Sequence, residues 1–455
     1  MVSIEQIESK VIDKIIPTEK DKRVLQDVVD TLLDIIKKEL SSRNLPAYTE
    51  IVGSIAKDTF LRNNLDIDLF LVFPTSFSKE DIGKIALDIG RKILDDTEEC
   101  YAEHPYIRGY YKDFKVEIVP CYSIENASQK LSAVDRTPLH TSYIKKHLKE
   151  FQKNQVRLFK QFLVGIGCYG AEAEIEGFSG YLSEILVLKF QTFQKLIETA
   201  KEWKPKVRLS LNNAQSPDFD TPLTFIDPVD KERNVASAVS IDKFNLFVKA
   251  SNEFINNPRI TFFFPNKPDL WSLEKIRSFI LNQDSIYFGI LFSKPEIIPE
   301  NLHPQIRKGM RSIASSCERY GFKILDYQYY VDEKNKTVYI ILKIEKSPIA
   351  EKYTHTGPPV DLTKNASDFK EKWIGNENMI NAPYEKNGRL YVDIKRKYTN
   401  INDFLIENVS GLSMGKDIDK KLQNRYEIVD ANKLLIKDLQ EFWTLYLDGR
   451  MSWEW

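Results

Sequence analysis

The sequence has little cysteine, and none of it is spaced as a metal or redox motif. Cys100, Cys121, Cys168 and Cys317 are the only four in 455 residues, with long, irregular gaps and no C-x-x-C pair. This spacing argues against zinc-finger and thioredoxin-type sites. Because free cysteine is among the most buried residue types, we expect four free, mostly buried thiols in a reducing cytoplasm.

Long apolar runs are also absent. No stretch of about 18 apolar residues occurs, so we expect no membrane span and no membrane partner. The first residues, MVSIEQIESKVIDKI, mix charged and apolar side chains and lack the continuous apolar core of a secretory signal. We therefore expect a cytoplasmic protein.

There is no excess of charge of one sign. The chain has 65 Lys and Arg against 66 Asp and Glu, a net charge of -1, which excludes an overall polycation. Local basic stretches remain at KEWKPKVR (201–208), IRKGMR (306–311) and DIKRKY (393–398). Each is a candidate for contact with RNA phosphates, and each is equally typical of a solvated surface.

The apolar residues that are present predict a multidomain α/β protein. Thr18 and Asp21 form a capping pattern before a long amphipathic helix, and Ser78 is the expected N-cap of a second helix. Strands are expected at 51–54, 65–74, 102–111 and 114–122. We divide the chain into an α/β head (1–145), a helical central domain (146–258), an α+β body of the split β-α-β type (259–350) and a tail with a closing helix at 431–449 (351–455).

Two aspartates interrupt the apolar strand LDIDLFLVF. Asp66 and Asp68 are two residues apart and project from one side of the strand, opposite Ile67 and Leu69. Two ionised carboxylates in a dry environment require a cation, and a divalent metal such as Mg²⁺ is the usual one. Taken alone, the pair is also typical of a solvated strand end.

Further residues strengthen the metal interpretation. Gly53 and Ser54 are expected to end the preceding strand in a turn whose amides point at an anion, with Lys57 adding a cation. Glu117 is a third acid, inside the apolar run KVEIVPCY. Three carboxylates on adjacent strands beside such a turn describe a two-metal nucleotidyl-transfer site.

The order of these motifs resembles the nucleotidyltransferase superfamily of the DNA polymerase β type. SAVDRTPLH, KQFLVGIGCYGAE, GFSGYLSEILV and FIDPVDKERNVA then look like the archaeal (class I) CCA-adding enzymes. That resemblance implies a polymerase β-like head with a mixed sheet. It also implies template-independent addition of C, C and A to the 3′ end of tRNA from CTP and ATP, with release of pyrophosphate.

The resemblance also assigns roles to single residues. Asp66, Asp68 and Glu117 would bind two Mg²⁺ ions, with Glu117 standing where most relatives have Asp. Ser54, Lys57, His140, Lys160 and Tyr169 would hold the nucleotide, chiefly its triphosphate.

Arg233 would read the base of the incoming nucleotide through its planar donors. Each of these residues has a plainer interpretation as well. For Arg233 it is a salt bridge to Asp227 or Asp230, and for His140 it is a hydrogen-bonded structural histidine.

The expected RNA partner is tRNA, held at its acceptor stem and elbow, and relatives are often homodimers. One alternative is another template-independent RNA nucleotidyltransferase, such as a poly(A) polymerase. A second alternative is a catalytically inactive RNA-binding protein of this fold, against which the three retained acids argue.

Overall fold

The chain forms two compact units in a computed structural model that describes residues 3–63, 65–101, 104–212, 217–346 and 349–455. The first unit contains Met1–Lys267 together with Arg450–Trp455, and the second contains Pro268–Gly449. Each is considered by itself below. Among the described residues, no helix combines the length and the apolar character that crossing a membrane requires.

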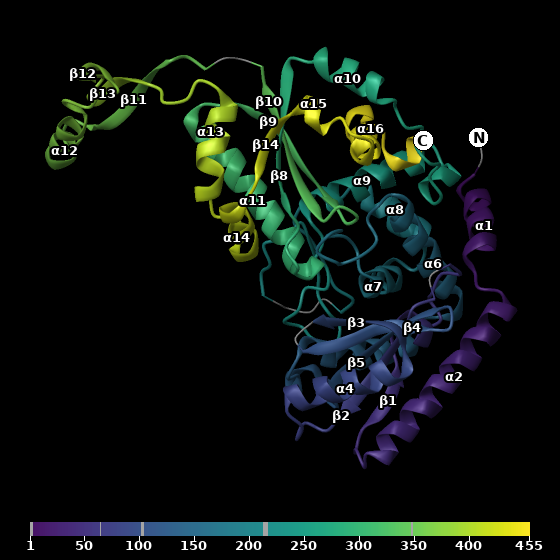
Figure 1. The fold of residues 1–455 in the computed structure, drawn as a ribbon. Helices are drawn as coiled ribbons and strands as arrows, with labels where there is room; N and C mark the ends of the chain where they lie inside the picture. The colour runs from purple at the N-terminus through teal and green to yellow at the C-terminus, as the bar shows by residue number, and fades with distance from the viewer. Residues whose placement is uncertain (1–2, 64, 102–103, 213–216, 347–348) are drawn as a thin grey trace. The chain divides into compact units, whose positions relative to one another are not determined.

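The first unit begins with a five-stranded mixed sheet covered by helices (Figure 1). Its strand order is β1-β2-β5-β4-β3, in which β2 and β5 are parallel and the other neighbours are antiparallel. The strands are β1 (Tyr48–Ile51), β2 (Ile67–Phe73), β3 (Asp95–Tyr101), β4 (Pro105–Tyr111) and β5 (Phe114–Tyr122). Helices α2 (Glu19–Ser42) and α4 (Lys79–Ile93) pack on this sheet.

Alternation along β2 gives the sheet two different faces. Ile67, Leu69 and Leu71 are buried in one core cluster with the apolar sides of α2 and α4. Asp68 therefore projects to the opposite face, which it shares with Phe70 and Val72. On the parallel neighbour β5, Glu117 is paired in register with Asp68. The acids thus lie on the face that α2 and α4 leave open.

A helical region with an aromatic core completes the first unit. Its helices are α1 (Ile4–Ile15), α5 (Arg136–His147), α6 (Glu150–Gly165), α7 (Gly180–Phe190), α8 (Phe193–Ala200) and α9 (Ile241–Asn256), with the short strands β6 (Val207–Leu209) and β7 (Leu223–Phe225). Phe162 contacts several phenylalanine rings of this core, among them Phe254 at a centroid distance of 5.6 Å. Trp453, near the C-terminus, stacks on Phe262 and closes the core.

The second unit is built on an antiparallel sheet with the order β14-β8-β10-β9. The strands are β8 (Ser285–Ser293), β9 (Ile324–Asp332), β10 (Thr337–Glu345) and β14 (Glu427–Asp430). Helix α11 (Pro299–Tyr320) buries Ile306, Met310 and Ile313 with residues of β8 and β10. Other helices of this unit are α10 (Leu273–Leu281), α13 (Ile401–Asn408), α14 (Lys416–Asn424), α15 (Ala431–Leu434) and α16 (Gln440–Asp448).

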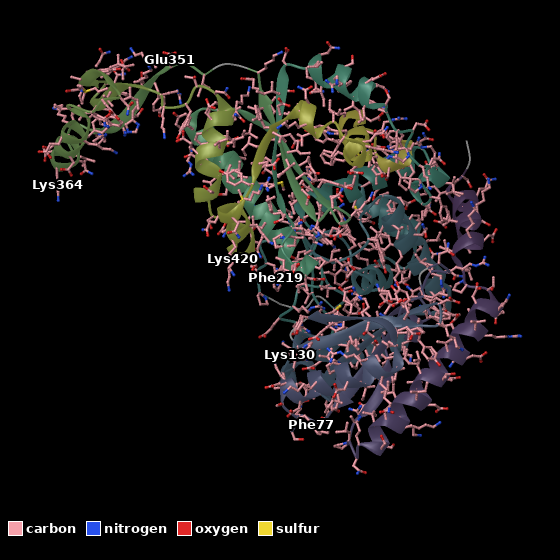
Figure 2. The ribbon with its side chains drawn as sticks, viewed as in Figure 1. Phe77, Lys130, Phe219, Glu351, Lys364 and Lys420 are labelled. Atoms are coloured by element: carbon pink, nitrogen blue, oxygen red, sulfur yellow. The ribbon has the colours of Figure 1, made fainter. Side chains whose placement is uncertain are left out.

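A small second sheet, β11-β13-β12, carries helix α12 (Thr363–Trp373). Its strands are β11 (Lys352–Pro359), β12 (Met379–Lys386) and β13 (Arg389–Lys395). Charged side chains cover the exterior of this unit, for example the exposed Lys364 on α12 and Lys420 on α14 (Figure 2).

Most local predictions agree with the structure. Thr18 caps α2 in a capping box with Asp21, and Ser78 caps α4. All four cysteines are free and buried. The mixed sheet of the head and the β-α-β-β order of the second unit are also as predicted.

Four local predictions are wrong. Gly53 and Ser54 do not end a strand, because β1 stops at Ile51 and α3 (Gly53–Ala56) follows. Asp66 precedes β2 rather than lying within it. The strand β3 is missing from the prediction, and the closing helix is divided into α15 and α16.

Two residues of the predicted strand 102–111, Ala102 and Glu103, lie outside the described residues.

Candidate active site

A cavity of about 500 Å³ in the first unit gathers eight of the nine predicted site residues. They are Ser54, Lys57, Asp66, Asp68, His140, Lys160, Tyr169 and Arg233. The ninth, Glu117, does not line the cavity but is the register neighbour of Asp68. The lining residues come from α3, the start of β2, the 3-10 helix Ala133–Asp135, the helices α5, α6 and α7, and two loops, so only the folded chain brings them together.

Gly53 allows the backbone to pass directly beside Asp68. Its φ angle is +68°, a conformation that glycine adopts without strain. A Cβ atom added here would lie 1.9 Å from Asp68 Oδ2, which is far inside van der Waals contact. Glycine is therefore required at this position both by its backbone angle and by the space that Asp68 occupies.

The carboxylates are arranged so that a cation would relieve their mutual repulsion. Burial raises the pKa of Asp68 to about 7, and the charges of Glu117 and Asp66 add to this rise. Burial also raises the pKa of Asp66, and Glu117 contributes. Oxygen ligands on two such acids suit a divalent metal ion. Within the described residues, however, no group of three or more metal-ligating side chains is already assembled.

Arg108 explains why Glu117 is not part of an assembled metal cluster. The two residues are direct cross-strand neighbours on β4 and β5, and Arg108 Nε donates to Glu117 Oε1 at 2.7 Å. Glu98 on β3 lies opposite Arg108, and their charged atoms are 4.0 Å apart. Glu98, Arg108, Glu117 and Asp68 therefore form a charged row across four strands. Glu117 would have to share its carboxylate between Arg108 and a metal ion.

Two of the predicted triphosphate-binding residues meet at a buried glutamate that the sequence prediction missed. Glu184 on α7 is fully buried, and its Oε2 accepts a hydrogen bond from Lys57 Nζ at 2.6 Å. Its Oε1 accepts one from Thr59 and lies 3.6 Å from Lys160 Nζ.

Burial and the neighbouring charges shift the pKa values of Glu184 and Lys160. Burial alone would raise the pKa of Glu184, but Lys57 and Lys160 hold it below its usual value. Burial lowers the pKa of Lys160 to about 8, although the negative charge of Glu184 acts to raise it.

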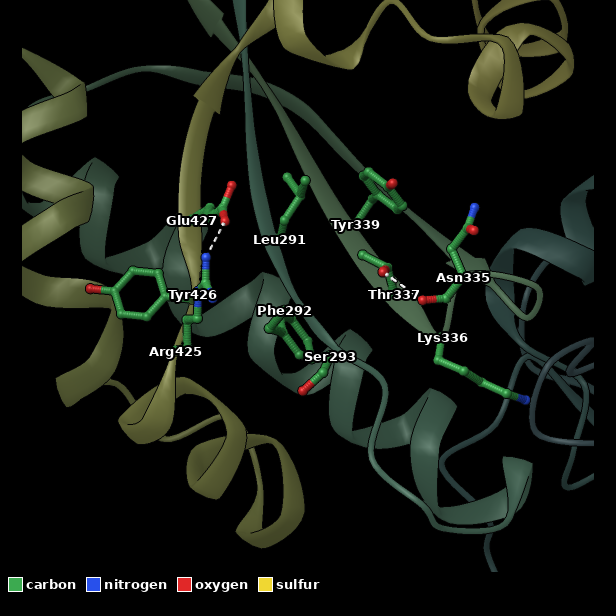
Figure 3. Close-up of a pocket in the computed structure, with 10 residues that line it drawn as sticks. All are labelled: Leu291, Phe292, Ser293, Asn335, Lys336, Thr337, Tyr339, Arg425, Tyr426 and Glu427. Carbon is green, nitrogen blue, oxygen red and sulfur yellow. Dashed lines mark hydrogen bonds and ion pairs between the residues drawn. The ribbon is translucent and has the colours of Figure 1, made fainter.

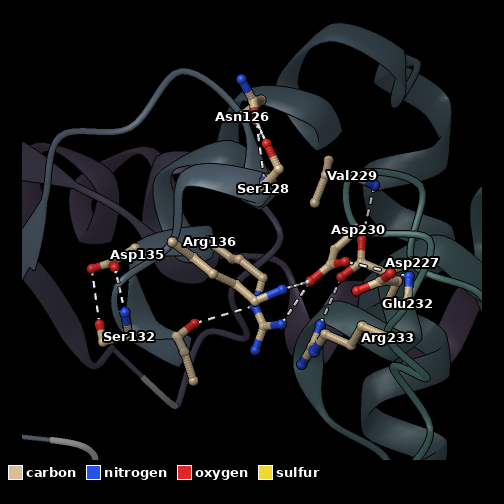
Figure 4. A network of polar contacts seen from close by, with 12 residues as sticks. Asn126, Ser128, Ser132, Asp135, Arg136, Asp227, Val229, Asp230, Glu232 and Arg233 are labelled. Atoms are coloured by element: carbon tan, nitrogen blue, oxygen red, sulfur yellow. Dashed lines mark hydrogen bonds and ion pairs between the residues drawn. The ribbon is translucent and has the colours of Figure 1, made fainter.

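Asp227 links His140 and Arg233 on another side of the cavity. Asp227 Oδ2 lies 2.9 Å from His140 Nε2. The same oxygen accepts from Arg233 Nη1 at 2.8 Å (Figure 4). The salt bridge considered for Arg233 is thus present, and Arg233 nevertheless lines the cavity. Burial lowers the pKa of His140, so the ring is neutral near pH 7.

The N-terminus of α7 opens onto the same cavity. Ser179 caps this helix by accepting from Leu182 N, and both Ser179 and Gly180 line the cavity. A Cβ at Gly180 would come within 3.1 Å of the Tyr169 hydroxyl and 3.8 Å of Lys160 Nζ. The missing side chain leaves room at a helix N-terminus, a position that favours anions.

Sequence signals for the missed residues exist but are weak. Glu184 stands inside the apolar run YLSEILVLKF, where an acid requires a buried partner. Asp227 was considered only as a partner of Arg233. Which distant cations these acids contact could not be read from the sequence.

The second unit has a cavity of its own, of about 460 Å³, between β14, β8 and β10 (Figure 3). Leu291 and Tyr339 form an apolar part of its wall, and Lys336 and Arg425 supply cations. It includes none of the nine predicted site residues and no pair of acids.

Three family models match successive parts of the chain. A family model described as a nucleotidyltransferase domain matches residues 33–140. The second domain of tRNA nucleotidyltransferase matches 154–264, and the C-terminal domain of the CCA-adding enzyme matches 283–431. Members of nucleotidyltransferase families generally use divalent metal ions.

Relatives match along nearly the whole chain. The CCA-adding enzyme of Methanosarcina mazei is 33% identical over 446 residues, which cover 96% of each chain. That of Haloarcula marismortui is 33% identical over 430 residues, or 91% of each chain. Because identity above 30% extends over almost the full length of both proteins, the chain belongs to the family of CCA-adding enzymes.

Proposed function

We propose that the cavity of the first unit is the site at which this enzyme adds C, C and A to the 3′ end of tRNA. CTP and ATP are the nucleotide donors, and pyrophosphate is released at each addition. The observation that carries the proposal is the convergence of eight predicted site residues from distant parts of the chain on one cavity. A protein that only binds RNA would have no need for buried, mutually repelling acids beside buried lysines.

Asp66 and Asp68 are the residues that would hold Mg²⁺, and Glu117 would contribute by sharing its carboxylate between Arg108 and the ion. Two bound ions would stabilise the attacking 3′ oxygen and the leaving phosphate oxygens. The support for this assignment is the elevated pKa of both aspartates, which burial and neighbouring negative charges produce. Gly53 holds the backbone against Asp68 and so keeps this carboxylate in a fixed place.

The triphosphate would lie between Lys57, Lys160 and the N-terminus of α7. Glu184 keeps both lysine ammonium groups together while no phosphate is present. Ser54 and Tyr169 supply hydroxyl groups to the same cavity. Charge-assisted hydrogen bonds from such groups stabilise the leaving pyrophosphate.

Selection of the nucleotide would depend on Arg233, which presents planar donors to the cavity. His140 lines the same wall and would contact the nucleotide beside it. No nucleic-acid template directs the choice, so the protein and the RNA end must form the complementary surface together.

The tRNA itself would be held by basic residues outside the cavity. In the stretch 393–398, Lys395, Arg396 and Lys397 line a smaller cavity of about 270 Å³ with the rings of Tyr353 and Trp373. Arg396 stacks over Tyr353 at 4.5 Å. Cations beside aromatic faces suit contact with RNA phosphates and bases. The stretches 201–208 and 306–311 also present exposed cations and stay candidates.

Three further predictions go with this function. The four-part domain division, a cytoplasmic location and a homodimer stay predictions, and sedimentation of the purified protein tests the last of them.

The direct test uses a tRNA transcript that ends at the discriminator base. It is incubated with the protein, Mg²⁺ and labelled CTP, ATP or both, and the products are resolved on a sequencing gel. Growth by three nucleotides that requires both CTP and ATP is the expected result. Asp68→Ala should abolish it, whereas Asp34→Ala, which changes an exposed acid on α2, should not. A long ladder with ATP alone would instead identify a poly(A)-type polymerase.

A further inference from the structure

One carboxylate behind the cavity wall organises three of its lining residues. Asp227, in the loop after β7, is 0% exposed. Its Oδ2 contacts His140 Nε2 and Arg233 Nη1, at 2.9 and 2.8 Å. Its Oδ1 accepts from Tyr181 Oη at 3.1 Å and from Val229 N at 3.0 Å. A carboxylate has about four lone-pair sites, so these bonds use its full capacity.

The three side chains that Asp227 holds all face the cavity. His140 comes from α5, Tyr181 from α7 and Arg233 from the loop itself, and each lines the cavity. Asp227 does not line that cavity, so it acts through these residues. The His140 and Tyr181 rings are stacked, with centroids 4.0 Å apart and planes 21° apart. Arg233 is engaged through Nη1 and keeps 31% of its side chain exposed, which leaves the rest of the guanidinium for a ligand.

The donors around Asp227 favour its ionised form. Burial alone would raise the pKa of Asp227, but the hydrogen bonds from His140, Val229 and Arg233 hold it at about 2. The neutral ring of His140 then has its proton on Nε2, because that atom faces the carboxylate. The ring therefore presents Nδ1 as an acceptor on its other side.

A second aspartate fastens the same loop without touching these three side chains. Asp230 Oδ2 accepts from Arg136 Nη1 at 2.8 Å and from Lys130 Nζ at 2.9 Å (Figure 4). Asp230 Oδ1 accepts from Glu232 N. The loop is thus held at two points by two similar carboxylates, of which only that of Asp227 bonds the side chains of Arg233, His140 and Tyr181. This pair offers a matched comparison.

We propose that Asp227 is a positioning residue that fixes Arg233, His140 and Tyr181 as one preformed wall and thereby sets the choice between CTP and UTP. The proposal rests on the function proposed above, in which Arg233 reads the base. Cytosine and uracil differ at one exocyclic group, and a donor rejects the wrong base only if it cannot move to a new partner. An arginine tied to a buried carboxylate cannot move in this way, whereas a free one adapts to either base.

The test compares Asp227→Asn with Asp230→Asn in the full chain. Asparagine keeps the shape and one accepting oxygen, but its amide nitrogen only donates. It therefore cannot accept on both sides, and either the His140 and Arg233 donors or the Tyr181 and Val229 donors lose their acceptor. We measure kcat and KM for CTP and for UTP on tRNA ending at the discriminator base. Circular dichroism and thermal unfolding report whether each variant is folded.

We expect Asp227→Asn to reduce the preference for CTP over UTP by at least about tenfold, chiefly through a higher KM for CTP. Asp230→Asn should keep the preference. Arg233→Gln should reduce the preference for CTP as Asp227→Asn does. The double variant Asp227→Asn/Arg233→Gln should reduce it no further than either single variant, because both substitutions act through one guanidinium. A general loss of stability would instead lower kcat for both nucleotides and leave the preference unchanged.

Other outcomes separate this proposal from the one it rests on. If Arg233→Gln loses the preference while folded Asp227→Asn keeps it, or if the two losses add in the double variant, the role of Asp227 is refuted and that of Arg233 stands. If Arg233→Gln keeps the preference for CTP, both base reading by Arg233 and the positioning role of Asp227 are refuted. If Asp227→Asn does not fold, Tyr181→Phe removes one bond to Asp227 and keeps the ring, and an unchanged preference there would refute the proposal.

Discussion

Replacing Glu184 tests whether a buried acid holds the two lysines of the proposed triphosphate site. Its carboxylate lies 2.6 Å from Lys57 Nζ, and the two side chains are 0% and 6% exposed. Removing one partner of such a buried pair leaves an uncompensated charge and costs about 3–5 kcal/mol. Here the loss strands both Lys57 and Lys160, so we expect Glu184→Gln to lower the free energy of unfolding by that amount.

An ion pair of the same length on the surface provides the control. Lys84 Nζ and Glu80 Oε1 are also 2.6 Å apart, but their side chains are 66% and 76% exposed. Solvent screens this pair, and Glu80→Gln should leave the free energy of unfolding nearly unchanged. Urea unfolding of the full chain, followed by circular dichroism, measures both variants. A cost for Glu184→Gln that is as small as the cost for Glu80→Gln would refute the reasoning.

The pH and nucleotide dependence of the same variant give two further checks. The pKa of folded Glu184 is below its usual value, so its stabilisation is present above that value and is lost as the pH falls through the folded pKa. The difference in free energy of unfolding between wild type and Glu184→Gln should therefore become smaller in acid. Saturating ATP should also narrow it, because the triphosphate replaces the missing negative charge. Binding at a hundredfold excess over Kd stabilises a protein by about 2.7 kcal/mol.

Three other predictions follow from the acidic face of the head sheet. Gly53→Ala should lower kcat for CCA addition at least about a hundredfold, measured by the gel assay, because its Cβ would displace the Asp68 carboxylate; near-normal activity would contradict this. In EDTA-treated protein the folded chain keeps the proton of Asp68 up to a pKa of about 7, against a usual value of 3.8. The contribution of Asp68 to the free energy of unfolding is therefore fully present below pH 3.8 and is lost as the pH rises through 7. Asp68→Asn should thus be more stable than wild type at pH 8 by roughly 2–4 kcal/mol in urea unfolding, a difference that should vanish near pH 3. Arg108→Gln should destabilise the EDTA-treated protein, since Glu117 loses its partner, and Mg²⁺ should restore more stability to this variant than to wild type, as thermal unfolding with and without the ion would show.

Most local elements and most of the residues that line the cavity could be predicted from the sequence. Thr18 and Ser78 cap helices through bonds to residues three positions away, so their effect is visible in a short segment. Alternation along 67–73 predicted a strand with Asp68 on the face opposite Leu69. The strand β3 escaped prediction because it is an edge strand of largely exposed acidic residues, which only its pairing with β4 organises.

Which charged side chains meet could not be predicted from the sequence, because their partners lie far along the chain. Glu184 reaches Lys57 across 127 residues and Asp227 reaches His140 across 87, and no local pattern encodes either contact. The sequence supplied the nine predicted residues, but it did not show that Glu117 is paired with Arg108 or that Gly53 lies in a helix against Asp68. The reason is physical: helix caps and strand alternation depend on neighbours in the chain, whereas the partner of a buried charge depends on which distant segments fold against it.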